Sequence, residues 1–129
     1  MAYHGLALVT ILALIEYSVL GFMVGRARQQ FGIAAPATTG NPDFERYFRV
    51  HQNTLESLAV FIPSLWIFGT TVSNAFAVAL GLLFIAGRGI YASGYIKDPA
   101  KREPGAIVTF AVNGILTLGS LIALIIKVL

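Results

Sequence analysis

The chain has 129 residues, of which 57% are hydrophobic and only 12% are charged, and it contains no cysteine. This composition is typical of an integral membrane protein and differs strongly from that of an average soluble domain. The absence of cysteine excludes disulfides, thiolate metal sites and a catalytic cysteine, and a net charge of +3 does not indicate nucleic-acid binding in so apolar a chain.

Four apolar stretches predict four transmembrane helices, at about residues 5–30, 44–72, 75–96 and 104–128. Each is long enough to cross a hydrocarbon core of about 30 Å, which takes about 20 helical residues. Together they use almost the whole chain. We therefore expect one domain over residues 1–129, an all-α four-helix transmembrane bundle with up-down-up-down connections.

The first helix carries one carboxylate, Glu16, in the middle of its apolar run. Because no basic residue precedes the run and Glu16 interrupts it, we expect the segment to be retained and not removed as a signal peptide. Glu16 is expected to pair with a neighbouring helix. It also leaves open a small multidrug transporter that exchanges protons for cationic drugs, although such a protein needs an acidic pocket and the polar faces here are rich in arginine.

The two longer connections carry most of the basic side chains. Because the predicted helices alternate in direction, both connections lie on one side of the membrane. These basic residues are Arg26, Arg28, Arg46, Arg49, Lys97, Lys101 and Arg102. The positive-inside rule predicts that this side is cytoplasmic. The short termini lead us to expect a bacterial inner membrane.

The second helix has a polar face. Arg46, Arg49, Asn53 and Glu56 are spaced three, four and three residues apart, so they lie on one side of a helix over about 15 Å. We expect Arg46, nearest the interface, to be structural or to reach the lipid head groups. The other three are candidates for binding.

The third helix repeats the pattern with Arg88, Tyr91 and Tyr95. Insertion of an ionisable group at the bilayer centre costs about 2.5–3.5 kcal/mol. We therefore expect Glu56 and Arg88, the deepest of these residues, to have a structural or binding role. One interpretation is that they pair with each other, or with the arginines of the second helix, as a structural clasp. The other is that both faces line a basic pocket for a small zwitterion, with arginines for its carboxylates, Glu56 for its ammonium and Asn53 for an amide. His4 and His51 are too far apart to form a recognisable motif, so no metal site is expected.

Three segments, FERYFRVHQNTLE, GRGIYASGY and APATTGNPDFER, together with Arg102, resemble the MAPEG family of microsomal glutathione transferases, cysteinyl-leukotriene synthase and the lipoxygenase-activating protein. The resemblance implies a homotrimer of four-helix subunits that binds glutathione between neighbouring subunits near the cytosolic face. It further implies that glutathione contacts Arg28 from the next subunit and a set from one subunit: Arg49, His51, Asn53, Glu56, Tyr91 and Tyr95. Two positions depart from the leukotriene synthase, which has a glutamine where His51 stands and a tyrosine where Ser57 stands.

The same resemblance places Arg102 against the glutathione sulfur, as the catalytic residue. A thiol with a pKa near 8.5 is only a few per cent thiolate at pH 7, and a guanidinium beside the sulfur favours the anion. The acceptor would be a lipophilic electrophile dissolved in the membrane lipid, or a lipid hydroperoxide reduced in a peroxidase reaction. The alternatives are a non-catalytic scaffold that binds glutathione or lipid, and an Arg102 that is only an exposed loop cation.

Overall fold

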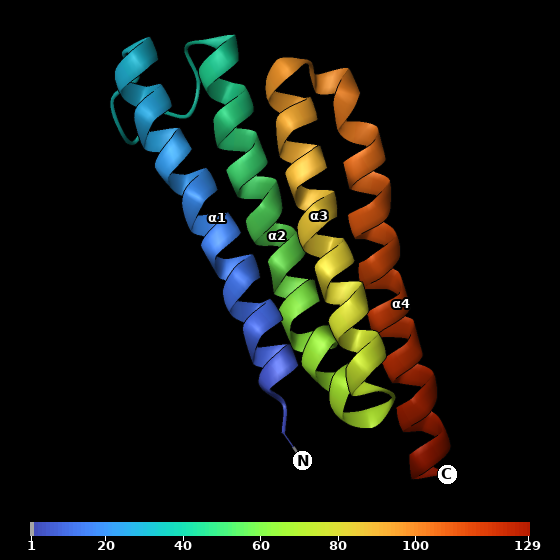
Figure 1. The fold of residues 1–129 in the computed structure, drawn as a ribbon. Coiled ribbons are helices and arrows are strands. Elements are labelled where there is room, and N and C mark those ends of the chain that lie inside the picture. Colours follow the sequence, from blue (N-terminus) through green and yellow to red (C-terminus); the bar gives the residue numbers. More distant parts are fainter. Residues whose placement is uncertain (1) are drawn as a thin grey trace.

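The computed structural model describes residues 2–129 and has four long helices that run up, down, up and down (Figure 1). They are α1 (His4–Phe31), α2 (Pro42–Thr71), α3 (Asn74–Lys97) and α4 (Glu103–Val128), with a short 3-10 helix, η1 (Pro99–Arg102), before α4. Each long helix has the length and apolar composition needed to cross a membrane. The described residues contain no strand, and the predicted all-α four-helix membrane bundle is confirmed.

Local capping fixes where the helices begin. The Asn41 side chain accepts hydrogen bonds from the backbone N–H groups of Asp43 and Phe44, at 2.9 and 3.0 Å. With Pro42 in the first turn, this cap starts α2 two residues before the predicted position. Ser73 caps α3 in the same way.

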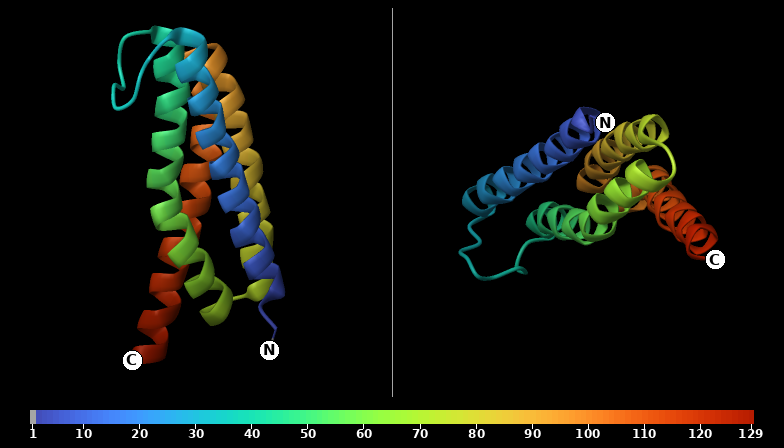
Figure 2. Two further views of the ribbon diagram at one scale, coloured as in Figure 1. Left: turned by 90° about the vertical axis from the view of Figure 1, so that its left-hand side faces the viewer. Right: turned by 90° about the horizontal axis from the view of Figure 1, so that it is seen from below.

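The helices α2 and α3 form the centre of the bundle, and α1 and α4 each pack against both of them (Figure 2). Both chain ends lie at one end of the bundle, opposite the α1–α2 loop and η1 (Figure 1). The outer helices expose large apolar side chains, as expected for surfaces that face lipid: Leu8, Ile11, Ile15, Phe22, Ile107, Phe110, Leu121 and Ile122.

An apolar core fills the half of the bundle nearer the termini. At its centre the rings of Phe61 on α2 and Phe84 on α3 stack with centroids 3.9 Å apart. Towards the loop end the buried side chains change to a cluster that includes Val50, Tyr91 and Tyr95. The change from apolar to polar packing places the candidate site in the loop half of the bundle.

The start of α4 packs closely against α3 at Gly105. A Cβ atom at this position would overlap backbone atoms of Tyr91. Only a residue without a side chain lets the start of α4 approach α3 so closely. Gly105 therefore sets the separation of α4 from the part of α3 that carries Tyr91.

Candidate functional site

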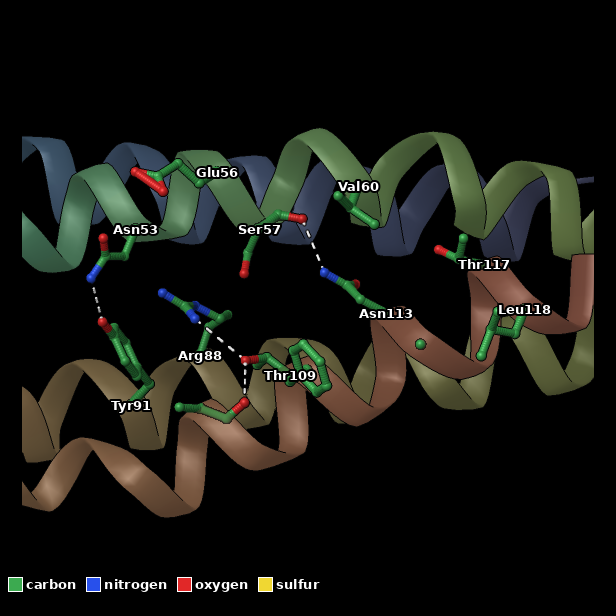
Figure 3. A pocket seen from close by; sticks show the side chains of 13 residues that line it. Asn53, Glu56, Ser57, Val60, Arg88, Tyr91, Thr109, Asn113, Thr117 and Leu118 are labelled. Atoms are coloured by element: carbon green, nitrogen blue, oxygen red, sulfur yellow. Dashed lines mark hydrogen bonds between the residues drawn. The ribbon is translucent and has the colours of Figure 1, made fainter. Parts of the chain in front are cut away.

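A groove of about 540 Å³ runs between α2 and α4, with α3 as its floor (Figure 3). Its polar lining comes from all three helices: Asn53, Glu56, Ser57, Arg88, Tyr91, Thr109, Asn113 and Thr117. Apolar side chains such as Val60, Phe110 and Leu118 complete it. The groove thus joins a hydrogen-bonding region to an apolar one.

Arg88 is the buried charge of the site, with 3% of its surface exposed. Its Nη2 donates a 2.8 Å hydrogen bond to Thr54 Oγ1 on α2, and its Nη1 a longer one of 3.4 Å to Thr109 Oγ1 on α4. The predicted clasp with Glu56 is wrong, because Arg88 forms no ion pair among residues 2–129. Glu56 lines the same groove, but the acceptors that the guanidinium bonds are the hydroxyls of the buried Thr54 and Thr109.

Four of the predicted binding or catalytic residues form a connected row. The Asn53 amide donates a 2.6 Å hydrogen bond to the Tyr91 hydroxyl, and the Tyr91 and Tyr95 ring centroids are 5.6 Å apart. Arg102, at the end of η1, lies 5.7 Å from the centroid of the Tyr95 ring. The row leads from the groove between α2 and α4 to the loop end of the bundle.

Arg49 and Glu56 lie on the same side of α2 as Asn53, and both side chains are exposed. Neither makes a hydrogen bond or an ion pair within residues 2–129. A cation, an amide and a carboxylate are therefore presented together along one helix. This combination complements a zwitterion with a peptide backbone.

Two residues predicted to contact glutathione lie elsewhere in the chain. His51 stacks on Tyr17 of α1, with ring centroids 4.2 Å apart, and lies against Gly21. Arg28 donates a 2.7 Å hydrogen bond to the Ala37 carbonyl and so holds the α1–α2 loop. Neither residue lines the groove.

Two further ionisable groups have roles that the structure clarifies. Arg46 Nη1 donates to the carbonyl oxygens of Lys97 and Ile96, at 3.0 and 3.4 Å, and so caps the end of α3, the structural role that was expected. Glu16 is half-buried and approaches α3 at Gly89. The pairing predicted for Glu16 is not formed within the part of the chain that the structure describes.

Three polar residues that contact the groove or its Arg88 were not predicted from the sequence. Thr54 and Thr109 accept the hydrogen bonds of Arg88, and Asn113 Nδ2 donates to the Ser57 carbonyl at 3.2 Å. A signal was present on the fourth helix, where Thr109, Asn113 and Thr117 recur every four residues in an apolar run. Within residues 2–129 no cluster of side chains is suited to bind a metal ion.

The family match and the relatives found by sequence comparison agree with one another. Residues 6–122 match the model of the MAPEG family. The chain is 44% identical to an uncharacterized protein of Synechocystis sp. over 119 residues, 92% of this chain and 87% of that one. It is 40% identical to human microsomal glutathione S-transferase 2 over 113 residues, 88% of this chain and 77% of that one. It is 33% identical to bovine leukotriene C4 synthase over 97 residues, 75% of this chain and 65% of that one.

Proposed function

Because the chain belongs to the MAPEG family, we propose that it is a membrane-bound glutathione transferase that conjugates glutathione to lipophilic electrophiles. Relatives with the names glutathione S-transferase and leukotriene C4 synthase support the reaction class. The observation that carries the proposal is the connected row of Asn53, Tyr91, Tyr95 and Arg102. It joins a groove lined by hydrogen-bonding groups to a guanidinium at the loop end.

The polar face of α2 would bind the tripeptide. Arg49 would bind a carboxylate of glutathione and Glu56 its ammonium group, since each side chain carries the opposite charge and is exposed. Asn53 and the hydroxyl of Tyr91 would bind its peptide groups, and Tyr95 would pack against its backbone. The side chains of Asn53, Tyr91 and Tyr95 are already hydrogen-bonded or stacked, so they lose little conformational entropy when glutathione binds.

The site would be completed by a second subunit of a homotrimer. Arg49 and Glu56 are exposed in a single chain, and the groove opens between α2 and α4, so a neighbouring subunit can close it. Arg28 holds the α1–α2 loop of its own subunit and would reach the glutathione of the next. His51, stacked on Tyr17, would support α2 from behind and would not touch glutathione in its own groove.

Arg102 would favour the thiolate. Its side chain is exposed at the end of η1 and lies over the Tyr95 ring, so it can meet a sulfur bound along the row. The thiol proton leaves to water, the thiolate attacks the electrophilic carbon, a carbon–sulfur bond forms, and the leaving group departs with its electron pair. With a lipid hydroperoxide the thiolate would attack the terminal oxygen, giving an alcohol and a sulfenic acid that a second glutathione converts to disulfide and water.

The loop end would face the cytoplasm of a bacterial cell, in the inner membrane. Most of the basic residues lie at this end, either at the helix ends next to the α1–α2 loop or in and next to η1. Glutathione would enter there from water. The electrophile would enter the apolar part of the groove from lipid.

Turnover of glutathione with a model aryl chloride by the purified protein in detergent tests this proposal. We expect a protein-dependent rate that saturates with glutathione, and calorimetry should detect glutathione binding. Binding without turnover with either an aryl chloride or a hydroperoxide would favour the non-catalytic scaffold. Absence of both binding and turnover would show that the proposal is wrong.

A further inference from the structure

We propose that Arg88 is a positioning residue of the glutathione site, which holds Tyr91 and the adjoining turn of α2 in place without touching glutathione itself. The inference rests on the proposed function, because Asn53 and Tyr91 are assigned there to glutathione. The position of Arg88 in the sequence does not distinguish a positioning role from a binding role. The contacts of its guanidinium favour the positioning role.

The guanidinium of Arg88 joins three helices. From α3 it reaches Thr54 on α2, at 2.8 Å, and Thr109 on α4, at 3.4 Å. Only 3% of its surface is exposed, and its third nitrogen, Nε, is buried without a partner. Arg88 is thus part of the groove wall, and its guanidinium, with so little of its surface exposed, is placed to hold its neighbours.

The same guanidinium reaches the proposed site through a closed path. Its central carbon lies 4.0 Å from the centroid of the Tyr91 ring, a cation–π contact on the same helix. The Tyr91 hydroxyl accepts the hydrogen bond of Asn53, and Asn53 precedes Thr54 on α2. The path from Arg88 through Tyr91, Asn53 and Thr54 therefore returns to Arg88. Movement of one member displaces the others.

The cost of this arrangement favours a role beyond packing. A guanidinium within the membrane is expensive, and hydrocarbon side chains would pack the three helices together with no such penalty. Here the charge is held by two neutral hydroxyls, and within residues 2–129 no carboxylate forms an ion pair with it. What hydrocarbon could not supply is a fixed cation beneath the Tyr91 ring and two directed hydrogen bonds that set the rotation of α2 and α4.

The substitution Thr54→Val tests the inference, because it keeps the shape of the side chain and removes the acceptor of the shorter hydrogen bond. We expect the KM for glutathione to rise about fivefold while kcat changes less than about twofold, since the lost contacts hold binding groups and do not reach the sulfur. Thr70→Val is the matched control: Thr70 is on the same helix, and its hydroxyl bonds only to carbonyls of its own helix, those of Trp66 and Ile67. This control should keep the wild-type KM.

A double-mutant cycle separates positioning from a general loss of stability. In wild type, Tyr91→Phe removes the hydroxyl that binds Asn53, whereas in Thr54→Val that hydroxyl is already displaced. The effect of Tyr91→Phe on KM should therefore be at most half as large, as a fold-change, in the Thr54→Val background. Multiplicative effects of the two substitutions, or a KM for Thr54→Val equal to that of the control, would overturn the inference.

Two further measurements keep the test decisive. If Thr54→Val does not fold, Thr109→Val removes the longer bond and should raise the KM about twofold to threefold. An unchanged KM in a folded Thr109→Val protein would then overturn the inference. Wild-type protein that neither binds nor turns over glutathione would contradict the proposed function, whereas active wild type with unshifted variants would contradict only the role of Arg88.

Discussion

The Asn53 side chain on α2 donates a 2.6 Å hydrogen bond to the hydroxyl of Tyr91 on α3, at one end of the groove (Figure 3). This is the one hydrogen bond between the two polar faces that the described residues make. It brings together groups that are 38 residues apart in sequence. The proposed glutathione site begins at this contact.

Substitution of Tyr91 by phenylalanine should weaken glutathione binding and leave chemistry largely intact. The change removes the hydroxyl but keeps the ring that contacts Arg88 and Tyr95. A lost hydrogen bond is worth about 0.5–1.5 kcal/mol, so the KM for glutathione should rise about threefold to tenfold. Steady-state kinetics measures this. Tyr3→Phe, at the opposite end of the bundle beside Trp66, is the control and should not change the KM.

Substitution of Arg102 by leucine should lower turnover much more than binding. If the guanidinium stabilises the thiolate, its loss should reduce kcat by about a hundredfold, the effect typical of one group that stabilises a developing anion. Calorimetry should give a dissociation constant for glutathione within about threefold of wild type. Lys101→Leu removes the adjacent exposed cation and should have little effect; a similar loss in both variants would indicate general attraction by a basic loop.

The pH dependence of the same variant gives an independent check. Without Arg102 the thiol of bound glutathione should ionise near its ordinary pKa of about 8.5, so the rate should rise steadily between pH 7 and 9. In wild type the thiolate should already be formed, and the rate should change less over that range. Equal slopes in the two proteins would argue against stabilisation of the thiolate by Arg102.

Mixed oligomers test whether Arg28 acts on the neighbouring subunit. Arg28→Ala and Arg102→Ala subunits should each be poorly active alone. In trimers assembled at random from equal amounts of both, about one quarter of the interfaces would have an intact Arg28 from one subunit and an intact Arg102 from the next. Co-expression should therefore restore about a quarter of wild-type activity. No recovery would place both residues in the site of one subunit, or show that Arg28 only holds the α1–α2 loop.

Substitution of Gly105 by alanine should destabilise the protein. The new Cβ would overlap the backbone of Tyr91, which cannot move aside as a flexible side chain can. Overpacking of this kind costs about 1–3 kcal/mol, so we expect a clearly lower Tm in detergent. Gly114→Ala, on the same helix, is the matched control, because no atom lies within 4 Å of its added Cβ. Equal Tm values would show that α4 can shift away from α3 at no cost.

The fold and much of the proposed site follow from local patterns. Four apolar runs gave four helices because a chain in lipid has to satisfy its backbone hydrogen bonds within each segment. Helical spacing placed Tyr91 and Tyr95 on one face and Asn53 near Glu56 on another. Contacts between residues that share a helix face depend on that spacing alone, and the Tyr91–Tyr95 contact is of this kind.

Contacts between helices were harder to predict. His51 shares α2 with Asn53, yet it stacks on Tyr17 of α1, and Arg88 pairs with Thr54 and Thr109 where a carboxylate was expected. A neutral hydroxyl is a weak signal in a sequence. Which hydroxyl meets a guanidinium depends on the rotation and depth of both helices, which no local pattern specifies.

The amino-acid sequence by itself determined that this protein is a four-helix membrane bundle with two polar faces and an excess of basic residues at one end, since hydrophobicity, helical period and charge act locally. The tertiary structure decided which polar groups meet. Close approach at Gly105 and the threonine contacts of Arg88 fix the relative positions of α2, α3 and α4. Those positions turn separate polar faces into one row from Asn53 to Arg102.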